Sequence, residues 1–322
     1  METKQKYIVG IDLGGMSAKA ALFDLDGNLI AKSKVKTCKE DGFEGTAKKL
    51  ADVAKEVAKV GGVSFDEVAA VGIASPGVIK DASINLKWGN YDWINVPLGE
   101  TVSGFLGKNV FVLNDANAAA LGEAKYGAAS QYNSSIFVTL GTGVGGGVII
   151  DGKLFEGFMG AGTEIGHIVI RQGGIPCGCG RKGCFERYAS ATGLMMTTKE
   201  KMQEDLSSKM WEIVGGKLEN VDGKTAFDGA AAGDKTAQKV LDEYIDALAE
   251  GLANLGNVLR PETFVIGGGV AAQGETLFEP LRKALNSKLY VPMETVPLKI
   301  VGAKLGNDAG AFGAFAFAKE NM

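Results

Sequence analysis

The sequence predicts a protein built from two related α/β lobes, and three observations support this fold class. Three short strands followed by a helix open the chain, and a similar succession begins again near residue 134. The chain has 322 residues, whereas a single hydrophobic core stops growing efficiently at about 250 to 300 residues. Hydrophobic residues make up 46% of the chain and charged residues 22%, which allows a packed interior and excludes the disordered and collagen-like classes.

Charge and the length of apolar runs exclude further classes. The chain carries 34 basic and 38 acidic residues, a net charge of −4, and like charges form no block of five. Neither nucleic acid nor an anionic membrane is therefore an expected partner. Apolar stretches stay below the roughly 18 to 20 residues that cross a bilayer, and the N-terminus has no apolar signal-peptide core. We expect a soluble, cytoplasmic protein that binds no membrane.

Glycine is unusually frequent. It accounts for 47 of the 322 residues, which is about twice the ordinary ~7%. Proline is scarce, with only 7 residues, so a low-complexity linker composition is not the cause. We expect these glycines to shape loops.

The first lobe begins with an antiparallel meander of three strands. The first turn is Gly-Gly, and the second is the turn-forming Asp-Gly-Asn around Gly27. A helix is expected from about Glu44 to Val60, and a loop carrying Trp88 and Trp93 follows a Ser-Pro-Gly break. An alanine-rich helix comes directly after the last strand. The expected strands are residues 7–12, 18–24, 29–36, 68–74 and 109–114.

The second lobe repeats this pattern and then becomes mainly helical. Residues 184–260 are expected to be mostly helical, with further helices at 275–288 and from Asp308 to the end. The expected strand segments are residues 134–140, 148–152, a β-like segment ending in HIVIR at 167–171, then 263–266 and 298–303.

The boundary between the lobes is expected near residue 120. Residues 1–120 form a small lobe, and residues 121–305 form a large lobe that contains a cysteine-rich loop. The closing helix, about residues 306–322, is expected to pack back on the small lobe.

The first glycine turn, within Gly10–Lys19, can approach a phosphate closely. Glycines 14 and 15 leave backbone N–H groups uncovered, and Asp12 just before them could hold a hydrated Mg²⁺. The alternative is an ordinary β-hairpin turn in which glycine provides a positive φ.

Two further glycine runs are candidate ligand contacts. The turn Leu140–Gly147 again joins two strands, and Thr142 adds a hydroxyl that could reach a phosphate; the alternative is a second hairpin turn. Gly267 to Gly269 lie between a buried type of strand and a helix, where a nucleotide base or sugar could pack on bare backbone. The alternative for this run is close packing.

Asp115 follows the strand that ends at Asn114 and begins a helix. α/β proteins place ligands at this junction, where the helix dipole favours an anion. A carboxylate fixed there could accept a hydroxyl proton during phosphoryl transfer. The alternative is an ordinary N-cap aspartate.

The cysteine-rich loop predicts a structural metal site. Cys177, Cys179 and Cys184 lie close in sequence, and His167, the only histidine, lies ten residues before them. Three thiolates and one imidazole satisfy a tetrahedral Zn²⁺ with no open position. The alternatives are a disulfide between Cys177 and Cys184, or buried free thiols. Glu164 and Glu186 flank the loop as candidate polar contacts for a hydroxyl-rich ligand.

These segments, taken in order, resemble the ROK family (repressor, open reading frame, kinase), specifically its bacterial glucokinase-type sugar kinases. The similarity spans the whole chain and rests on DLGGMSAK, SPG, NYDW, LNDANAAALGE, GTGVGGG, the ExGH motif with CGCGRKGCFE, and VIGGG. The resemblance implies a duplicated actin-like, RNase H-type fold whose two lobes hold ATP and Mg²⁺ in the cleft between them. It also implies zinc, a homodimer or homotetramer, and transfer of a phosphoryl group from ATP to the 6-hydroxyl of a hexose.

Glucose is the hexose that the resemblance favours. The alternatives are a kinase for fructose, mannose, allose, N-acetylglucosamine or N-acetylmannosamine, or a sugar-sensing member of the family without catalysis. The last alternative is motivated by Met16, which stands where the family usually has threonine, so that a phosphate-side hydroxyl is missing or displaced to Ser17.

The resemblance also implies a role for each matching residue. Asp115 is the expected base, and Asp12 is expected to face Mg²⁺. The expected sugar contacts are Asn90, Asn114, Asp115, Glu164, His167 and Glu186. The expected ATP contacts are Asp12, Gly14, Gly15, Ser17, Lys19, Thr142, Gly143, Gly268 and Gly269, and the expected zinc ligands are His167, Cys177, Cys179 and Cys184.

Overall fold

The structure is a computed structural model, and it describes residues 6–88 and 92–322. The chain divides into two compact units. The first comprises Met1–Asn133, Gly147–Thr163 and Lys304–Met322, and the second comprises Ser134–Gly146 and Glu164–Ala303. The boundary expected near residue 120 falls inside helix α3 (Asp115–Tyr126), which lies wholly in the first unit. This helix packs along α10 (Ala309–Asn321), so the chain has no break at that point.

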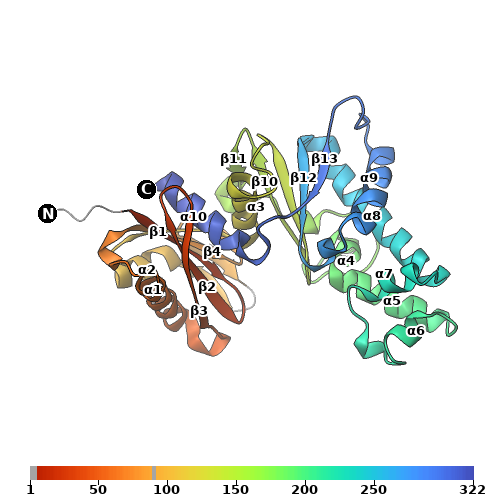
Figure 1. Cartoon of the computed structure of the whole chain (residues 1–322), viewed down its shortest axis with the longest axis horizontal. Helices are drawn as coiled ribbons and strands as arrows, with labels where there is room; N and C mark the ends of the chain where they lie inside the picture. The colour runs from red at the N-terminus through yellow and green to blue at the C-terminus, as the bar shows by residue number, and fades with distance from the viewer. Residues whose placement is uncertain (1–5, 89–91) are drawn as a thin grey trace. The chain divides into compact units, whose positions relative to one another are not determined.

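The first unit contains a five-stranded sheet in the order β3-β2-β1-β4-β8 (Figure 1). Neighbouring strands β1, β2 and β3 pair antiparallel, whereas β4 and β8 continue the sheet in parallel with β1. The predicted meander of three strands is therefore confirmed. The strands are β1 Tyr7–Leu13, β2 Ser17–Asp24, β3 Leu29–Lys36, β4 Val68–Ser75 and β8 Asn109–Asn114.

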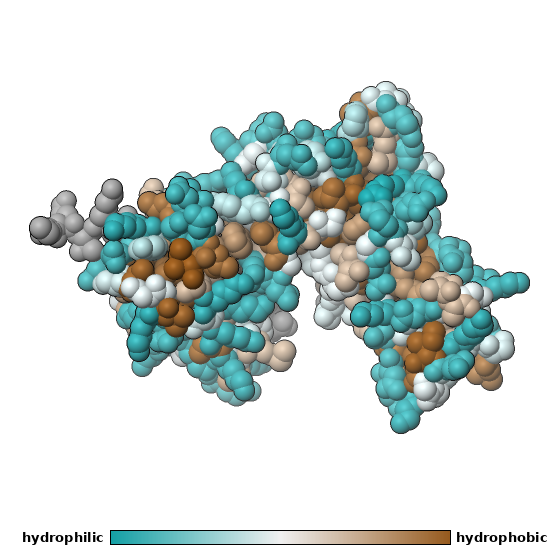
Figure 2. Space-filling view, viewed as in Figure 1, coloured by the Kyte–Doolittle hydropathy of each residue, from teal (hydrophilic) through white to brown (hydrophobic). Residues whose placement is uncertain are grey.

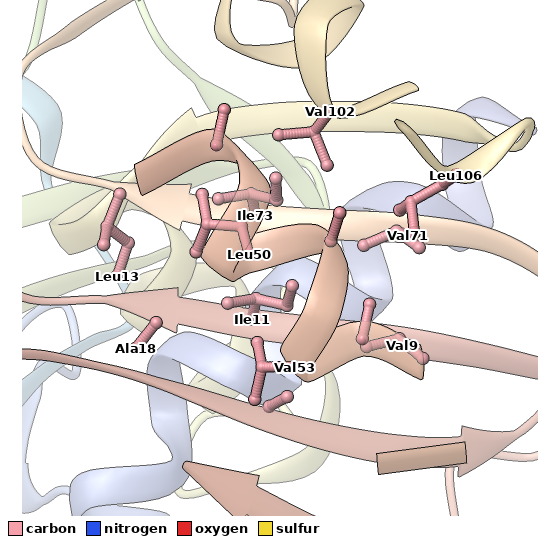
Figure 3. Packing of buried hydrophobic residues seen from close by; sticks show 14 of the residues in the cluster. Val9, Ile11, Leu13, Ala18, Leu50, Val53, Val71, Ile73, Val102 and Leu106 are labelled. Carbon is pink, nitrogen blue, oxygen red and sulfur yellow. The ribbon is translucent and has the colours of Figure 1, made fainter. Parts of the chain in front are cut away.

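Helices α1 (Gly42–Val60) and α2 (Leu98–Leu106) pack against the sheet through one hydrophobic core. Leu50, Val53 and Val57 of α1 recur at the spacing of one helix face and are buried. Figure 3 shows side chains of α1 and α2 meeting those of β1 and β4, among them Ile11 and Ile73. This core fixes β1, whose end carries Asp12.

Helix α10 packs on β1, β4 and α3 so closely that their backbones nearly touch. A Cβ atom added at Gly72 in β4 would lie 1.9 Å from the carbonyl oxygen of Ala314, and one at Gly313 would lie 1.7 Å from that of Ala118. Neither position admits a side chain. The expectation that the glycines shape loops is therefore wrong for these residues, because they allow a helix to lie against a sheet and another helix.

The segment expected to be a loop carrying Trp88 and Trp93 is instead a small antiparallel sheet followed by α2. Its strands β5 (Val78–Lys80), β6 (Ile84–Trp88) and β7 (Trp93–Val96) pair in sequence order. Strands of three to five residues are too short to produce a clear alternation, which explains why the sequence did not predict them.

A second five-stranded sheet has the order β11-β10-β9-β12-β13, which repeats the topology of the first. The recurrence of the opening pattern is thus confirmed. Strands β9, β12 and β13 run parallel, β10 and β11 pair antiparallel, and the division between the units falls within β10. The strands are β9 Ser135–Leu140, β10 Val144–Ile150, β11 Lys153–Phe155, β12 Thr263–Gly267 and β13 Lys299–Gly302.

The helices of the second unit lie mostly where the sequence predicts them. Residues 184–260 are mainly helical, and α9 has the predicted bounds Glu275–Lys288. The remaining helices are α4 Glu186–Ala189, α5 Ala191–Glu204, α6 Met210–Ile213, α7 Thr225–Ala231 and α8 Lys235–Leu259.

The expected β-like segment ending in HIVIR is wrong. Ile165–His167 forms a 3-10 turn, and beyond it only one isolated bridge joins Val169 to Cys184. The backbone bonds to the cysteine-rich loop instead, since the N–H of Phe185 donates to the carbonyl oxygen of Ile168 at 2.8 Å. The alternation of apolar residues in HIVIR therefore reflects packing against this loop and not the pairing of a strand.

The face of the molecule in Figure 2 is mostly hydrophilic, with small separate groups of apolar residues. Among residues 6–88 and 92–322, none of the helices combines the length and the apolar character needed to cross a membrane.

Candidate functional site

The first glycine turn joins β1 to β2, and the N–H of Gly14 donates to the carbonyl oxygen of Ser17 at 2.9 Å. Gly14 and Gly15 are not among the glycines with positive φ. A Cβ atom at Gly15 would meet nothing within 4 Å. The turn is thus a hairpin, but without the positive φ that the ordinary hairpin alternative expects of its glycines. Neither turn geometry nor packing requires glycine at position 15, where a side chain would have open space. The neighbouring Met16 side chain is 84% exposed.

Asp12 lies near three other charged groups of the first unit. Burial raises the pKa of its carboxyl group, Lys19 lowers it, and the negative charges of Asp115 and Asp308 raise it further. The Lys19 ammonium is 3.9 Å from the Asp12 carboxylate, and a Cβ atom at Gly310 would be 3.0 Å from it. Carboxylates that raise one another's pKa are stabilised by a bound cation, and oxygen ligands of this kind suit Mg²⁺.

Sequence reasoning missed Asp308. It precedes α10 at the far end of the chain, and no local motif relates it to Asp12. Lys32 of β3 lies 2.6 Å from its carboxylate. Only the packing of α10 on β1 brings this residue to the β1–β2 turn.

Asp115 is the first residue of α3 but does not cap it. The cap is Asn114, whose side-chain oxygen accepts the N–H groups of Ala116 and Asn117 at 2.9 and 3.0 Å. The Asn114 amide donates to the carbonyl oxygen of Gly77 at 3.0 Å, which ties the helix start to the Ser-Pro-Gly segment. The N-cap alternative for Asp115 is therefore wrong, and its carboxylate is available for another role.

Burial raises the pKa of the Asp115 carboxyl group, and hydrogen bonds from nearby backbone and Asn114 partly oppose this. The N–H of Ala116 donates to its Oδ1 at 2.8 Å. A carboxylate with a raised pKa is a stronger base than an exposed aspartate. It suits proton abstraction from an alcohol.

The second glycine turn, in the second unit, faces Glu186. A Cβ atom at Gly143 would lie 2.6 Å from Glu186 Oε2. The turn is held by the N–H of Ala191, at the start of α5, which donates to the carbonyl oxygen of Gly141 at 2.8 Å. Thr142 lies between these contacts.

The third glycine run divides between the two alternatives. Gly268 has φ 84°, and a Cβ atom there would be 2.5 Å from the backbone of Leu140. A Cβ atom at Gly267 would be 2.9 Å from the Phe137 ring. These two glycines are required by close packing. A Cβ atom at Gly269 would meet nothing within 4 Å, so this position offers an open surface.

The structure brings the histidine and three of the cysteines together in one cluster. All four cysteines of the chain lie in its described part and carry free thiols, so the Cys177–Cys184 disulfide alternative is wrong. The ligand atoms of His167, Cys177, Cys179 and Cys184 all lie within 4.8 Å of one another.

The spacing of these ligand atoms fits a tetrahedral zinc ion. Cys177 Sγ is 3.7 Å from His167 Nδ1, and the sulfurs of Cys179 and Cys184 are 3.6 Å apart. Zinc–sulfur bonds of about 2.3 Å at tetrahedral angles place two thiolates about 3.8 Å apart. Burial raises the pKa of the Cys177 thiol to about 12, so a thiolate there requires a cation beside it.

Glu186 links this cluster to the second glycine turn. Its Oε1 is 3.2 Å from Cys177 Sγ and 3.8 Å from His167 Nδ1. Because Nδ1 faces the thiols, the other ring nitrogen of His167 is left for a different partner. The backbone N–H of His167 donates to the backbone carbonyl oxygen of Glu164, whose side chain is exposed.

The expected site residues fall into two groups. Asp12, Gly14, Gly15, Ser17, Lys19, Asn114 and Asp115 lie in the first unit, and Thr142, Gly143, Glu164, His167, Glu186, Gly268 and Gly269 lie in the second. Asn90 lies outside the described residues.

Comparisons with known proteins agree on one family. The family model described as ROK family matches residues 8–321. The glucokinase of Thermotoga maritima is 36% identical over 317 residues, which cover 98% of each chain. The xylose repressor of Caldicellulosiruptor bescii is 30% identical over 98% of this chain and 78% of its own length. A crystal structure of a ROK family glucokinase from Streptomyces griseus in complex with glucose and AMPPNP has 33% identity and a TM-score of 0.81, covering 98% of this chain and 99% of that one.

Proposed function

The chain belongs to the ROK family, and from this premise we propose that it is an ATP-dependent kinase that phosphorylates glucose at its 6-hydroxyl. Its fold is the duplicated actin-like α/β fold of the family. The observation that carries the proposal is the Asp115 carboxylate at the start of α3. It does not cap the helix, and its pKa is raised. The chain around it is similar to glucokinases over nearly its whole length.

Asp115 serves as the general base. It accepts the proton of the sugar 6-hydroxyl while the hydroxyl oxygen bonds to the γ-phosphorus, and the bond from that phosphorus to the β,γ-bridging oxygen breaks. Asn114 holds the helix start and thereby the position of Asp115. General bases of this kind contribute about 10² to 10⁴ in rate.

The donor side of the site lies on the glycine turns. When bound, ATP supplies the phosphoryl group and Mg²⁺ supplies positive charge beside it. Asp12, near whose carboxyl group Asp308 adds negative charge, would hold the Mg²⁺. Lys19, Ser17 and Gly15, where an added Cβ atom would meet nothing within 4 Å, contact the phosphates. In the second unit, Thr142 and Gly143 contact phosphate, while Gly269 with Gly268 lies near adenosine.

The remaining sugar hydroxyls are bound by Asn90, Asn114, Glu164, His167 and Glu186. We assign His167 to both the metal site and the sugar site. Its Nδ1 faces Cys177 and would bind the metal, and its other ring nitrogen would contact the sugar. His167, Cys177, Cys179 and Cys184, whose ligand atoms lie within 4.8 Å of one another, would hold a structural Zn²⁺ with four protein ligands and no open position. These four ligands would thereby fix the loop that carries Glu186.

The test is a coupled ADP-release assay over glucose, fructose, mannose, allose, N-acetylglucosamine and N-acetylmannosamine. We expect the highest kcat/KM with glucose. Absence of turnover with every sugar, in protein that is folded and contains zinc, would contradict the proposal. We further propose that the protein is cytoplasmic and forms a homodimer or homotetramer. Light scattering coupled to size-exclusion chromatography tests the oligomeric state.

A sugar-sensing protein without catalysis is the second candidate, and Met16 favours it. The exposed Met16 side chain provides no hydroxyl at the first glycine turn. Calorimetry distinguishes the candidates, because a sensor binds sugar without binding ATP. If the chain is a kinase, Met16→Thr should lower the KM for ATP.

A further inference from the structure

The segment between β11 and Glu164 has a strained backbone. Met159, with φ 56°, and Thr163 are its non-glycine residues with positive φ, a conformation that costs energy in residues other than glycine. Thr163 has φ 60°, although a β-branched residue is a genuine outlier in this conformation. Such a conformation persists only where surrounding contacts hold it in place, and it occurs most often at functional sites.

Asn117 holds both ends of this segment. The Thr163 hydroxyl donates to Asn117 Oδ1 at 3.2 Å. At the other end, burial raises the pKa of the Glu156 carboxyl group, and the nearby Asn117 side chain partly opposes this. Asn117 is only 2% exposed, and it lies in the first turn of α3, two residues after Asp115. One buried amide therefore closes the segment 156–163, which we call the clamped loop.

Backbone contacts complete the clamped loop. The N–H of Gly162 donates to the carbonyl oxygen of Glu156 at 2.8 Å. A Cβ atom at Gly160 would lie 1.9 Å from the carbonyl oxygen of Ile79 in β5, so the loop is seated on the small sheet. Its tip is free of this packing, since the Phe158 side chain is 87% exposed.

We propose that Asn117 and Thr163 are positioning residues for the sugar site. The hydrogen bond between them fixes the strained backbone of Thr163, which sets the direction in which the chain enters Glu164, a proposed sugar ligand. This inference rests on the proposed function. The strain supports it, because glycine would adopt the same backbone without cost and a purely structural turn has no need of a threonine hydroxyl.

Two substitutions at Thr163 separate the hydroxyl from the shape of the side chain. Thr163→Val keeps the branched shape and its strain but removes the hydroxyl, which leaves Asn117 Oδ1 buried without this donor. Thr163→Ser keeps the hydroxyl. We expect Thr163→Val to raise the KM for glucose about fivefold or more, the size of one lost hydrogen bond, with kcat within about twofold. Thr163→Ser should leave both near their wild-type values. Equal effects of the two substitutions, or no effect of either, would overturn the proposal.

Hydrogen exchange in the absence of sugar tests the clamp without relying on activity. Thr163→Val and Asn117→Ala should accelerate exchange of the Gly162 amide and its neighbours at least about tenfold. Asp151→Gly is a matched control, because Asp151 also has a positive φ of 51° but lies in the β10–β11 turn. It should change neither exchange in the clamped loop nor the KM. Accelerated exchange in a chain that phosphorylates no hexose would refute only the proposed function, whereas unchanged exchange in an active enzyme refutes the clamp.

Discussion

Replacing Asp115 with asparagine removes the proposed base and nearly preserves the shape of the side chain. The asparagine oxygen can still accept the N–H of Ala116, which donates to Asp115 Oδ1 at 2.8 Å. Loss of a general base costs about 10² to 10⁴ in rate, or about 3 to 5 kcal/mol in activation free energy. We therefore expect kcat to fall by this factor, while glucose affinity stays within about tenfold because the lost interaction belongs to the transition state.

The same substitution should not destabilise the fold at neutral pH. Burial raises the pKa of Asp115 above its unfolded value of 3.8, so the folded state binds the proton more tightly than the unfolded state. Stability contributed by this group is complete below pH 3.8 and is lost as pH rises through the raised value. An uncharged asparagine avoids that loss. Asp115→Asn should therefore unfold at the same temperature as wild type or higher at pH 7 to 8, and its advantage should vanish in acid.

The two measurements are the ADP-release assay and thermal unfolding at several pH values. Asp52→Asn is the control, since Asp52 is an exposed residue of α1, and it should alter neither. The assignment of Asp115 fails if its asparagine variant keeps more than about a tenth of the wild-type kcat. It also fails if sugar affinity is lost while kcat is unchanged.

Three other predictions concern the metal and the fold. Elemental analysis should find about one zinc per chain; Cys179→Ser should lower this content and raise the glucose KM, whereas Cys38→Ser should do neither, since Cys38 lies outside the cluster. Glu123 is fully buried, and its carboxylate accepts the N–H groups of Ala128, Lys304 and Leu305. Glu123→Gln should therefore lower the free energy of unfolding in urea by about 3 kcal/mol. A change near zero would contradict a stabilising role for this carboxylate. Gly72→Ala should lower the free energy of unfolding by about 2 kcal/mol or more, because its Cβ atom would lie 1.9 Å from the Ala314 carbonyl oxygen. Gly104→Ala is the matched control in α2, where the added Cβ atom has open space. It should raise the free energy of unfolding by up to about 1 kcal/mol.

The sequence predicted best the elements whose patterns are long and bounded by clear signals. The β1–β2–β3 meander has turns made of glycine and Asp-Gly-Asn, and α9 is preceded by Gly274 with a left-handed φ. Its amphipathic pattern fixes its length, because Leu277, Phe278, Leu281 and Leu285 fall on one buried face. Local information is sufficient for such elements.

Elements that depend on distant contacts were not predictable from local patterns. Strand β5 contacts β8 and the clamped loop, which lie far from it in sequence, and its three residues are too few to show a period. The HIVIR segment alternates as a strand does, but it is held by Gly183 and Phe185 across the cysteine-rich loop. In both cases tertiary packing decided the local structure.

The site shows the same limit. The sequence indicated His167 and its three cysteines because their chemistry and spacing are specific. Thr163 and Asn117 gave no such signal, since a threonine before a glutamate and an asparagine in a helix are common. Their importance becomes visible only from a positive φ and a hydrogen bond that joins two distant segments.

The glycine content connects the composition of the chain to the geometry of the proposed Mg²⁺ site. Gly72 and Gly313 let α10 lie directly on β4 and α3. Because α10 lies so close to the sheet, its first turn lies against β1, where a Cβ atom at Gly310 would be 3.0 Å from the Asp12 carboxyl group. Asp308, just before α10, then lies near enough to raise the pKa of Asp12. Glycines in a strand and in helices, and not in the turns alone, thus bring together two carboxylates from opposite ends of the chain.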